Sequence, residues 1–116
     1  MGTNQDCIFC RIASGELGTE FVRETDSVVA FNDIAPAAAT HVLVVPRRHL
    51  GSVAELGQHE QGILADLIDV ANAVARERGL DKSGYRVLTN HGTDAGQTVQ
   101  HVHFHVLGGN TLGPLG

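Results

Sequence analysis

The sequence has few aromatic residues and no excess of basic ones. Its 116 residues include no Trp, one Tyr and four Phe, so a core must be built from Val, Leu, Ile and Ala. Eight Lys and Arg stand against 13 Asp and Glu, which gives a formal net charge of −5. A surface that binds nucleic acid needs a dense basic patch, and the only basic doublet here is Arg47-Arg48. We therefore expect no nucleic-acid partner.

Long apolar runs are also missing. No segment approaches the ~20 apolar residues that a membrane-spanning helix needs. The segment Met1–Asp6 has neither a basic region nor a long apolar stretch, so we expect no secretory signal, no membrane association and a cytoplasmic location. Hydrophobic residues make up 42% of the chain and charged residues 18%, which excludes intrinsic disorder. At about 100–200 residues per domain, the length predicts a single domain over 1–116.

Short apolar segments between turn residues predict a small mixed fold. The runs that favour strands lie at 20–23, 28–31, 41–46, 85–89 and 101–107. Apolar residues at three- and four-residue spacing over 63–75 predict one long helix that ends at Gly79, and 7–13 is expected to form a short helical turn. Ser52–Glu55 matches a capping box. The predicted class is α+β, with a five-stranded antiparallel sheet, one long helix on one face and a short N-terminal helix.

Histidine is the residue present in excess. The chain has seven, of which four lie between positions 91 and 105. Side chains alternate faces along a strand, so the apolar residues of 101–107 point to a core while His101, His103 and His105 point the other way. At ~3.3 Å per residue, the first and last of these are about 13 Å apart, and one metal ion cannot easily bind all three. The pattern favours imidazoles with separate roles as nucleophile, general acid or metal ligand over a plain polar face.

The two cysteines, Cys7 and Cys10, form a C-x-x-C pair. This spacing suits zinc, but it also occurs in redox pairs that follow a strand in a βαβ unit, and no strand is predicted before it here. A closed zinc site would need two further ligands, which the spare histidines could supply. Two reduced, buried thiols are the third interpretation, because free Cys is common in cores.

The segment His101–Leu107 resembles the signature of the histidine triad family of nucleotide-binding proteins. Other segments agree with that family in order and spacing: Asp6–Cys10, Phe31–Pro36, Thr40–Pro46 and Gly84–Asn90. The resemblance extends from about Asp6 to Gly109 and is closest to the purine nucleoside phosphoramidase branch. Members of this branch act on AMP or GMP joined to an amine or another leaving group.

The resemblance implies a hydrolase that forms a nucleotidyl-histidine intermediate at the α-phosphorus and then releases a nucleoside monophosphate. His103 would be the nucleophile, His105 would bind phosphate oxygens and help to deliver a proton, and His41 would complete the relay. Thr98 would offer a hydroxyl where the family most often has Ser. The residues implied to bind the nucleotide are Asp33 at the ribose hydroxyls, Asn90, Gln97 and Val99 at the phosphate, and Phe9, Ile12, Ile34 and Leu43 around the base.

The resemblance also implies a structural zinc and a homodimer. The zinc ligands would be Cys7, Cys10, His49 and His101, which leaves His103 and His105 for chemistry. His59 and His91 are expected at the surface. The dimer would join across the long helix and the strand at 85–89, with 108–116 near the partner's site.

Three other functions stay open at this stage. The first is a dinucleoside polyphosphate hydrolase, the nearest relative in chemistry. The second is a nucleotide-binding interaction module in which catalysis is incidental. The third is a hydrolytic metal centre built on the three histidines themselves. The expected partner is a purine nucleotide or a nucleotidyl conjugate.

Overall fold

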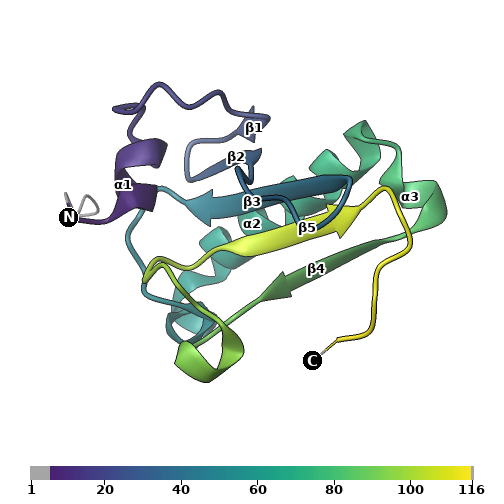
Figure 1. Cartoon of the computed structure of the whole chain (residues 1–116). Helices are drawn as coiled ribbons and strands as arrows, with labels where there is room; N and C mark the ends of the chain where they lie inside the picture. The colour runs from purple at the N-terminus through teal and green to yellow at the C-terminus, as the bar shows by residue number, and fades with distance from the viewer. Residues whose placement is uncertain (1–5, 116) are drawn as a thin grey trace.

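The computed structural model describes residues 6–115, and its centre is a five-stranded antiparallel sheet (Figure 1). The spatial order of the strands is β1-β2-β3-β5-β4. Their bounds are β1 (Arg23–Glu24), β2 (Val28–Asn32), β3 (Thr40–Pro46), β4 (Tyr85–Thr89) and β5 (Phe104–Gly108). The predicted α+β class is confirmed.

Three α-helices and three 3-10 helices complete the described part of the chain, residues 6–115. They are α1 (Ile8–Ala13), η1 (Val53–Glu55), η2 (Gln58–Glu60), α2 (Gln61–Glu77), α3 (Leu80–Ser83) and η3 (Thr93–Ala95). The long helix α2 ends where expected, because Gly79 adopts a left-handed conformation with φ 74° that L-residues rarely reach. Within the described residues, none of the helices has the length and apolar character required to cross a membrane.

The predicted capping box at Ser52 forms in a modified way. The Ser52 hydroxyl accepts a hydrogen bond from the Ala54 N–H, as an N-cap should. The Glu55 carboxylate accepts from the N–H of Gly51 rather than from that of Ser52. At the other short helix, α1, the N-cap is Cys7, whose sulfur accepts from the Cys10 N–H at 3.4 Å.

The two faces of the sheet are covered differently, and this difference places the site. One face packs against α2, which buries a cluster of Val, Ala, Leu and Phe side chains. The opposite face packs against the much shorter α1, with Phe31, Leu43 and Val45 buried among α1 residues. Burial on both sides explains why β2 and β3 are continuous apolar runs. Since α1 has only six residues, it covers only part of this face.

The strand predicted at 101–107 is shorter in the structure. Its ladder begins at Phe104, since residue 102 donates its N–H to the carbonyl of Leu50 instead of pairing within the sheet. The predicted alternation is nevertheless confirmed: Val102, Phe104 and Val106 all join the cluster under α2. The strand predicted at 20–23 is also shifted, because only Arg23–Glu24 pairs with β2.

Candidate functional site

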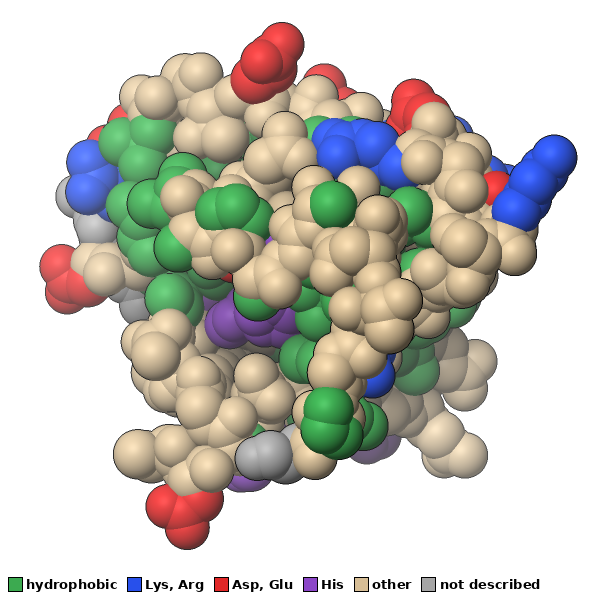
Figure 2. All heavy atoms as spheres, turned by 45° about the vertical axis from the view of Figure 1, so that its right-hand side comes forward, with side chains coloured by type: hydrophobic (Ala, Val, Ile, Leu, Met, Phe, Trp, Pro, Cys, Tyr) green, Lys and Arg blue, Asp and Glu red, His purple; other side chains and the backbone are tan. Residues whose placement is uncertain are grey.

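A chain of imidazoles lies on the face of the sheet that α1 covers. His41, at the start of β3, places its Nε2 2.8 Å from Nδ1 of His105 in β5. The cross-strand register explains the contact, since Leu43 pairs with His105 and His41 lies two residues earlier on the same face of β3. The ring of His103 follows, with its centre 5.1 Å from that of His105. Figure 2 shows histidine side chains at the floor of a hollow that hydrophobic side chains border.

Backbone hydrogen bonds determine which ring nitrogen of each of these histidines carries the proton. The Ala37 N–H donates to His41 Nδ1 at 2.9 Å, so the His41 proton must be on Nε2. His41 Nε2–H then donates to His105 Nδ1, which leaves the His105 proton on Nε2. That Nε2 is buried and has no hydrogen-bond partner among the described residues, 6–115. The arrangement therefore holds an N–H donor ready for a ligand.

His103 has the opposite arrangement. Its Nδ1 lies 2.8 Å from the His101 carbonyl and must donate to it, because a carbonyl can only accept. The unshared electron pair of His103 is therefore on Nε2. The Phe9 ring of α1 supports this imidazole edge-on, with ring centres 5.0 Å apart. An available lone pair thus lies beside an available N–H, which is the combination needed for nucleophilic attack with proton transfer.

Burial keeps His105 neutral. It lowers the pKa of His105 to about 4, with a smaller contribution from the neighbouring imidazoles of His103 and His41. The carboxylate of Asp33 acts in the opposite direction and raises this pKa. One Asp33 oxygen lies 3.4 Å from His41 Nε2, and the other accepts from the Ala35 N–H. A bound anion would add to the effect of Asp33 and favour protonation of His105.

A pocket of about 420 Å³ opens beside these histidines. Nine of the residues singled out from the sequence line it: Phe9, Ile12, Asp33, Ile34, Leu43, Thr98, Val99, His103 and His105. Four further residues line it that the sequence analysis did not select: Ile8, Thr19, Phe31 and Asn32. Ile8, Phe31 and Asn32 belong to segments already noted for their spacing, whereas nothing in the sequence pointed to Thr19. The side chain of Ile34 is fully exposed at 101%, so it forms part of the rim.

Asn90 and Gln97 do not line this pocket. Asn90 follows β4 directly and is half-buried; its neighbour Thr89 donates its hydroxyl to the His103 carbonyl. The Gln97 side chain is buried and donates to the carbonyls of Gly51 and Val99, while its oxygen accepts from the Gly92 N–H. Gln97 therefore braces the loop that carries Thr98 and Val99.

A second group of side chains gathers where α1 meets the segment before β5. His101 Nδ1 lies 3.3 Å from the Cys7 sulfur and 3.5 Å from the Cys10 sulfur, and His49 Nδ1 lies 3.3 Å from the Cys10 sulfur. The four ligand atoms all lie within 4.8 Å of one another. His101 Nε2–H donates to the Pro46 carbonyl at 2.8 Å, which leaves the lone pair of Nδ1 facing the sulfurs.

These four residues fit a structural zinc ion. Two sulfurs and two imidazole nitrogens are a common tetrahedral donor set for zinc, with bonds of about 2.0–2.3 Å. Burial lowers the pKa of His101 to about 4, so its imidazole is in the neutral form that a metal binds. Cys7, Cys10 and His101 are buried and His49 is half-buried. A closed set of four protein ligands would supply stability rather than an open coordination position.

The two remaining histidines lie at the surface, as predicted: His59 and His91 are both exposed. The Ser52 hydroxyl lies 2.6 Å from His91 Nδ1. Since this hydroxyl oxygen accepts from Ala54, its hydrogen is available to donate to the imidazole. Neither histidine lines the pocket beside His103.

Comparisons with known proteins agree with this geometry. The family model of the HIT domain matches residues 14–112. The chain is 36% identical over 111 residues to the purine nucleoside phosphoramidase of Escherichia coli K12, which covers 96% of this chain and 93% of that protein. A HIT family hydrolase from Clostridium thermocellum superposes with a TM-score of 0.92 at 43% identity, covering 97% of this chain and 98% of that one. A histidine triad nucleotide-binding protein from Candida albicans gives 0.79 at 32% identity, with 95% and 85% covered.

The chain therefore belongs to the HIT domain family, and the family inferred from residues 101–107 is confirmed. The hydrolase names among its relatives identify it further as a hydrolase of that family.

Proposed function

We propose that this protein hydrolyses nucleoside 5′-phosphoramidates or related nucleotidyl conjugates at the α-phosphorus and releases a nucleoside monophosphate. The observation that carries the proposal is the pairing of a free lone pair on His103 Nε2 with an unpartnered donor on His105 Nε2. Both side chains line a pocket of about 420 Å³ that a small molecule can enter. The name of the Escherichia coli relative supports this substrate class.

The reaction proceeds in two displacements at phosphorus. The bound substrate anion and Asp33 favour the protonated form of His105. His103 Nε2 attacks the α-phosphorus while the P–N bond breaks; the departing amine keeps the electron pair of that bond and takes a proton from Nε2 of the protonated His105, which becomes neutral. The His103 Nδ1–H remains bonded to the His101 carbonyl, which stabilises the positive charge on the modified ring. Water then attacks phosphorus, breaks the P–Nε2 bond and returns a proton to His105. The net change is water consumed, with amine and nucleoside monophosphate released.

The other pocket residues bind the nucleotide in this proposal. The purine lies among the apolar side chains of Phe9, Ile12, Ile34 and Leu43, all of which line the pocket. The Asp33 carboxylate accepts hydrogen bonds from the ribose hydroxyls. Thr98 offers its hydroxyl to the phosphate or the leaving group, with Val99, Gln97 and Asn90 at the phosphate side. Gln97 contributes by holding the loop, because its own polar atoms bond within the protein.

The proposal includes a structural zinc bound by Cys7, Cys10, His49 and His101. The ion links α1 to the residues after β3 and to the segment before β5. Because α1 carries Phe9 and Ile12, the ion would also hold this wall of the base pocket in place. Thiolate ligands need a reducing compartment, which supports a cytoplasmic location.

The proposal further includes a homodimer in which the whole chain, 1–116, acts as one domain. β4 is an edge strand of the sheet, and all five of its residues are half-buried. A partner that joins across α2 and β4 would cover this edge. Light scattering that gives a mass near the 12.3 kDa of a single chain at micromolar concentration would exclude the dimer.

A hydrolysis panel tests the proposed function. The substrates are an AMP–lysine conjugate, AMP morpholidate, a GMP phosphoramidate and diadenosine polyphosphates. We expect turnover of the phosphoramidates and release of the nucleoside monophosphate. Cleavage of the polyphosphates alone would favour the dinucleoside polyphosphate hydrolase, and binding without any turnover would favour an interaction module.

A further inference from the structure

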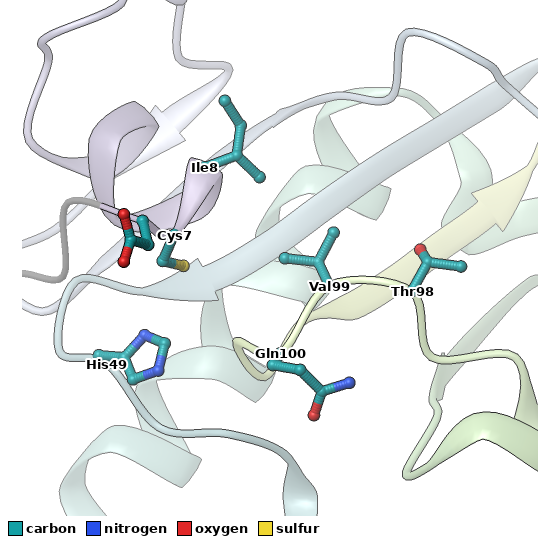
Figure 3. A pocket seen from close by; sticks show the side chains of 7 residues that line it. Cys7, Ile8, His49, Thr98, Val99 and Gln100 are labelled. Atoms are coloured by element: carbon teal, nitrogen blue, oxygen red, sulfur yellow. The ribbon is translucent and has the colours of Figure 1, made fainter.

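The hydroxyl of Thr98 lies on a part of the chain that has no regular structure of its own. Thr98 lines the pocket beside His103, yet its side chain is exposed and it lies between η3 and β5, outside every helix and strand (Figure 3). Irregular segments are more mobile than the helices and strands that they connect. The position of this hydroxyl at the pocket therefore depends on what holds the loop before it.

The residues just before Thr98 form a compact turn, the 92–97 turn. Its two ends are joined by two hydrogen bonds: the backbone N–H of Gln97 donates to the Gly92 carbonyl at 3.1 Å, and the N–H of Gly92 donates to the Gln97 side chain at 2.9 Å. The Ala95 N–H also donates to the Gly92 carbonyl, at 3.2 Å. The turn is thus held together as one unit, and Thr98 follows it directly.

Two side-chain hydrogen bonds attach the 92–97 turn to the segment that joins β3 to α2, which lies beside it (Figure 1). At the end of the turn, Gln97 donates to the Gly51 carbonyl at 2.7 Å. Directly before its start, His91 places Nδ1 2.6 Å from the hydroxyl oxygen of Ser52. The segment is itself held in place, because its residue Leu50 is buried in the cluster under α2. Losing either bond would leave the turn attached at one end only.

The bond between Ser52 and His91 is one that the protein needs. Ser52 is only 5% exposed, and its oxygen already accepts from the Ala54 N–H, so its hydrogen requires an acceptor within the protein. The exposed imidazole of His91 provides that acceptor. Neither residue lines the pocket beside His103. Any effect of this pair on a ligand in that pocket must therefore act through the 92–97 turn.

We propose that His91 is a positioning residue: its bond to Ser52 keeps the 92–97 turn in place and thereby holds the Thr98 hydroxyl at the phosphate. This inference rests on the proposed function, in which Thr98 serves the phosphate or the leaving group. The apolar wall of the pocket is supplied instead by α1, β2 and β3, which carry Phe9, Phe31 and Leu43. His91 therefore affects the binding of a phosphate group and not that of the nucleoside.

Calorimetry with AMP and with adenosine tests this assignment, because only AMP carries a phosphate. In His91→Ala we expect Kd for AMP to rise about three- to tenfold, as for one lost hydrogen bond, while Kd for adenosine changes by less than about twofold. The kcat/KM for adenosine 5′-phosphoramidate should fall by about tenfold or more, since small errors of position reduce the rate strongly. An equal loss for AMP and adenosine, or no loss for either, overturns the proposal.

Further variants show whether the bond itself is responsible. His91→Asn keeps an acceptor atom on Cγ, where the imidazole has Nδ1, and should restore AMP affinity to within about twofold of the wild type. In the Ser52→Ala background, His91→Asn and His91→Ala should behave alike, because the hydroxyl is gone. In the Thr98→Val background, His91→Ala should no longer weaken AMP binding. His59→Ala, at an exposed histidine of η2, should change nothing.

Two outcomes of these comparisons contradict the assignment. If His91→Asn is as impaired as His91→Ala in the otherwise wild-type protein, the hydrogen bond to Ser52 is not what matters. If His91→Ala keeps its full effect on AMP in the Thr98→Val background, it does not act through Thr98.

The binding measurement needs no turnover, so it distinguishes this inference from the function on which it rests. If His91→Ala weakens AMP selectively but the wild type hydrolyses none of the panel substrates, the positioning role stands and the proposed function fails. If the wild type hydrolyses the phosphoramidate, but His91→Ala changes neither AMP binding nor kcat/KM, the positioning role alone fails.

Discussion

Two clusters in this protein have similar ligand atoms but opposite hydrogen bonding. The first is Cys7, Cys10, His49 and His101, and the second is Asp33, His41 and His105; in each, the ligand atoms lie within 4.8 Å of one another. Composition alone would allow a metal in either, because two histidines and a carboxylate are also a familiar metal-binding set.

The backbone decides between them. His101 Nε2 faces a carbonyl, that of Pro46, so its Nδ1 lone pair is available to a metal. His41 Nδ1 faces an N–H, that of Ala37, so its Nε2 carries a proton where a metal would need a lone pair. The first cluster is therefore suited to binding a metal ion, and the second to holding and transferring a proton. The function of a histidine here therefore depends on which backbone group, a carbonyl or an N–H, bonds to its other ring nitrogen.

The largest expected effect concerns His103, which connects the two clusters through its bond to the His101 carbonyl. We predict that His103→Ala abolishes turnover, because the lone pair on His103 Nε2 is the proposed nucleophile, and that AMP binding survives. Wild-type reactions stopped during turnover should contain phosphorus attached to histidine. The matched control, His59→Ala, changes an exposed histidine and should keep normal kcat. Near-normal kcat in His103→Ala would disprove the covalent mechanism.

The second effect concerns the cysteine cluster. The double variant Cys7→Ser, Cys10→Ser should lose zinc and melt at a lower temperature, because the link between α1 and the sheet is lost. A loss of about 2–3 kcal/mol lowers the Tm of a domain of this size by roughly 10 °C. Nucleotide binding should loosen, while His103 still forms its adduct.

A chelator provides the control for this variant. Stripping the wild type should lower its Tm to that of the double variant, whereas the double variant should not respond. Substoichiometric zinc in protein purified without a His-tag from zinc-replete cells would instead identify Cys7 and Cys10 as ordinary buried thiols.

The third effect concerns Asp33 in the second cluster. If its carboxylate accepts from the ribose hydroxyls, the wild type should bind AMP more tightly than 2′,3′-dideoxy-AMP. A lost hydrogen bond to a charged group corresponds to about 1.5–3 kcal/mol, or roughly ten- to a hundredfold in Kd. Asp33→Ala should bind both nucleotides with similar affinity. Equal discrimination by the two proteins would show that Asp33 acts on the histidines alone.

The last effect, which is absent at neutral pH, is a pH dependence of stability that arises from His105. Its pKa is lowered to about 4 in the folded protein, against an ordinary value of 6.5. Between these two values the unfolded chain binds more protons, so the free energy of unfolding decreases as the pH falls from about 6.5 to 4 and is constant above that window. The wild type should therefore lose more stability than His105→Gln in denaturant titrations over this range. Parallel curves for the two proteins would argue against a depressed pKa.

Much of the architecture could be predicted from local patterns. The alternation at 101–107, the apolar run ending at Pro46 and the spacing over 63–75 placed three strands or helices close to their observed positions. These signals are strong because burial of a face requires a fixed period. Strand ends were less predictable: whether residue 102 joins the ladder depends on Leu50, which is remote in sequence.

No local pattern in the sequence indicated the tertiary contacts of the site. Arg47 was noted only as part of a basic doublet, yet its guanidinium donates to the carbonyls of Ala13 and Thr25 and links the end of α1 to the sheet. No local pattern indicated that the buried side chain of Gln97 braces the loop that carries Thr98 and Val99. The proton positions of His41 and His101 were equally inaccessible, since they depend on a carbonyl and an N–H that only the fold brings to the rings.

Nitrogen-15 NMR of the labelled protein tests the central claim most directly, because long-range couplings show which ring nitrogen of each histidine carries the proton. The account predicts a proton on Nε2 of His41, His101 and His105, and on Nδ1 of His103. One equivalent of zinc should shift Nδ1 of His49 and His101 and leave His41 and His105 unchanged. A proton on Nε2 of His103, or zinc-induced shifts at His41 and His105, would contradict the division into a metal cluster and a proton cluster.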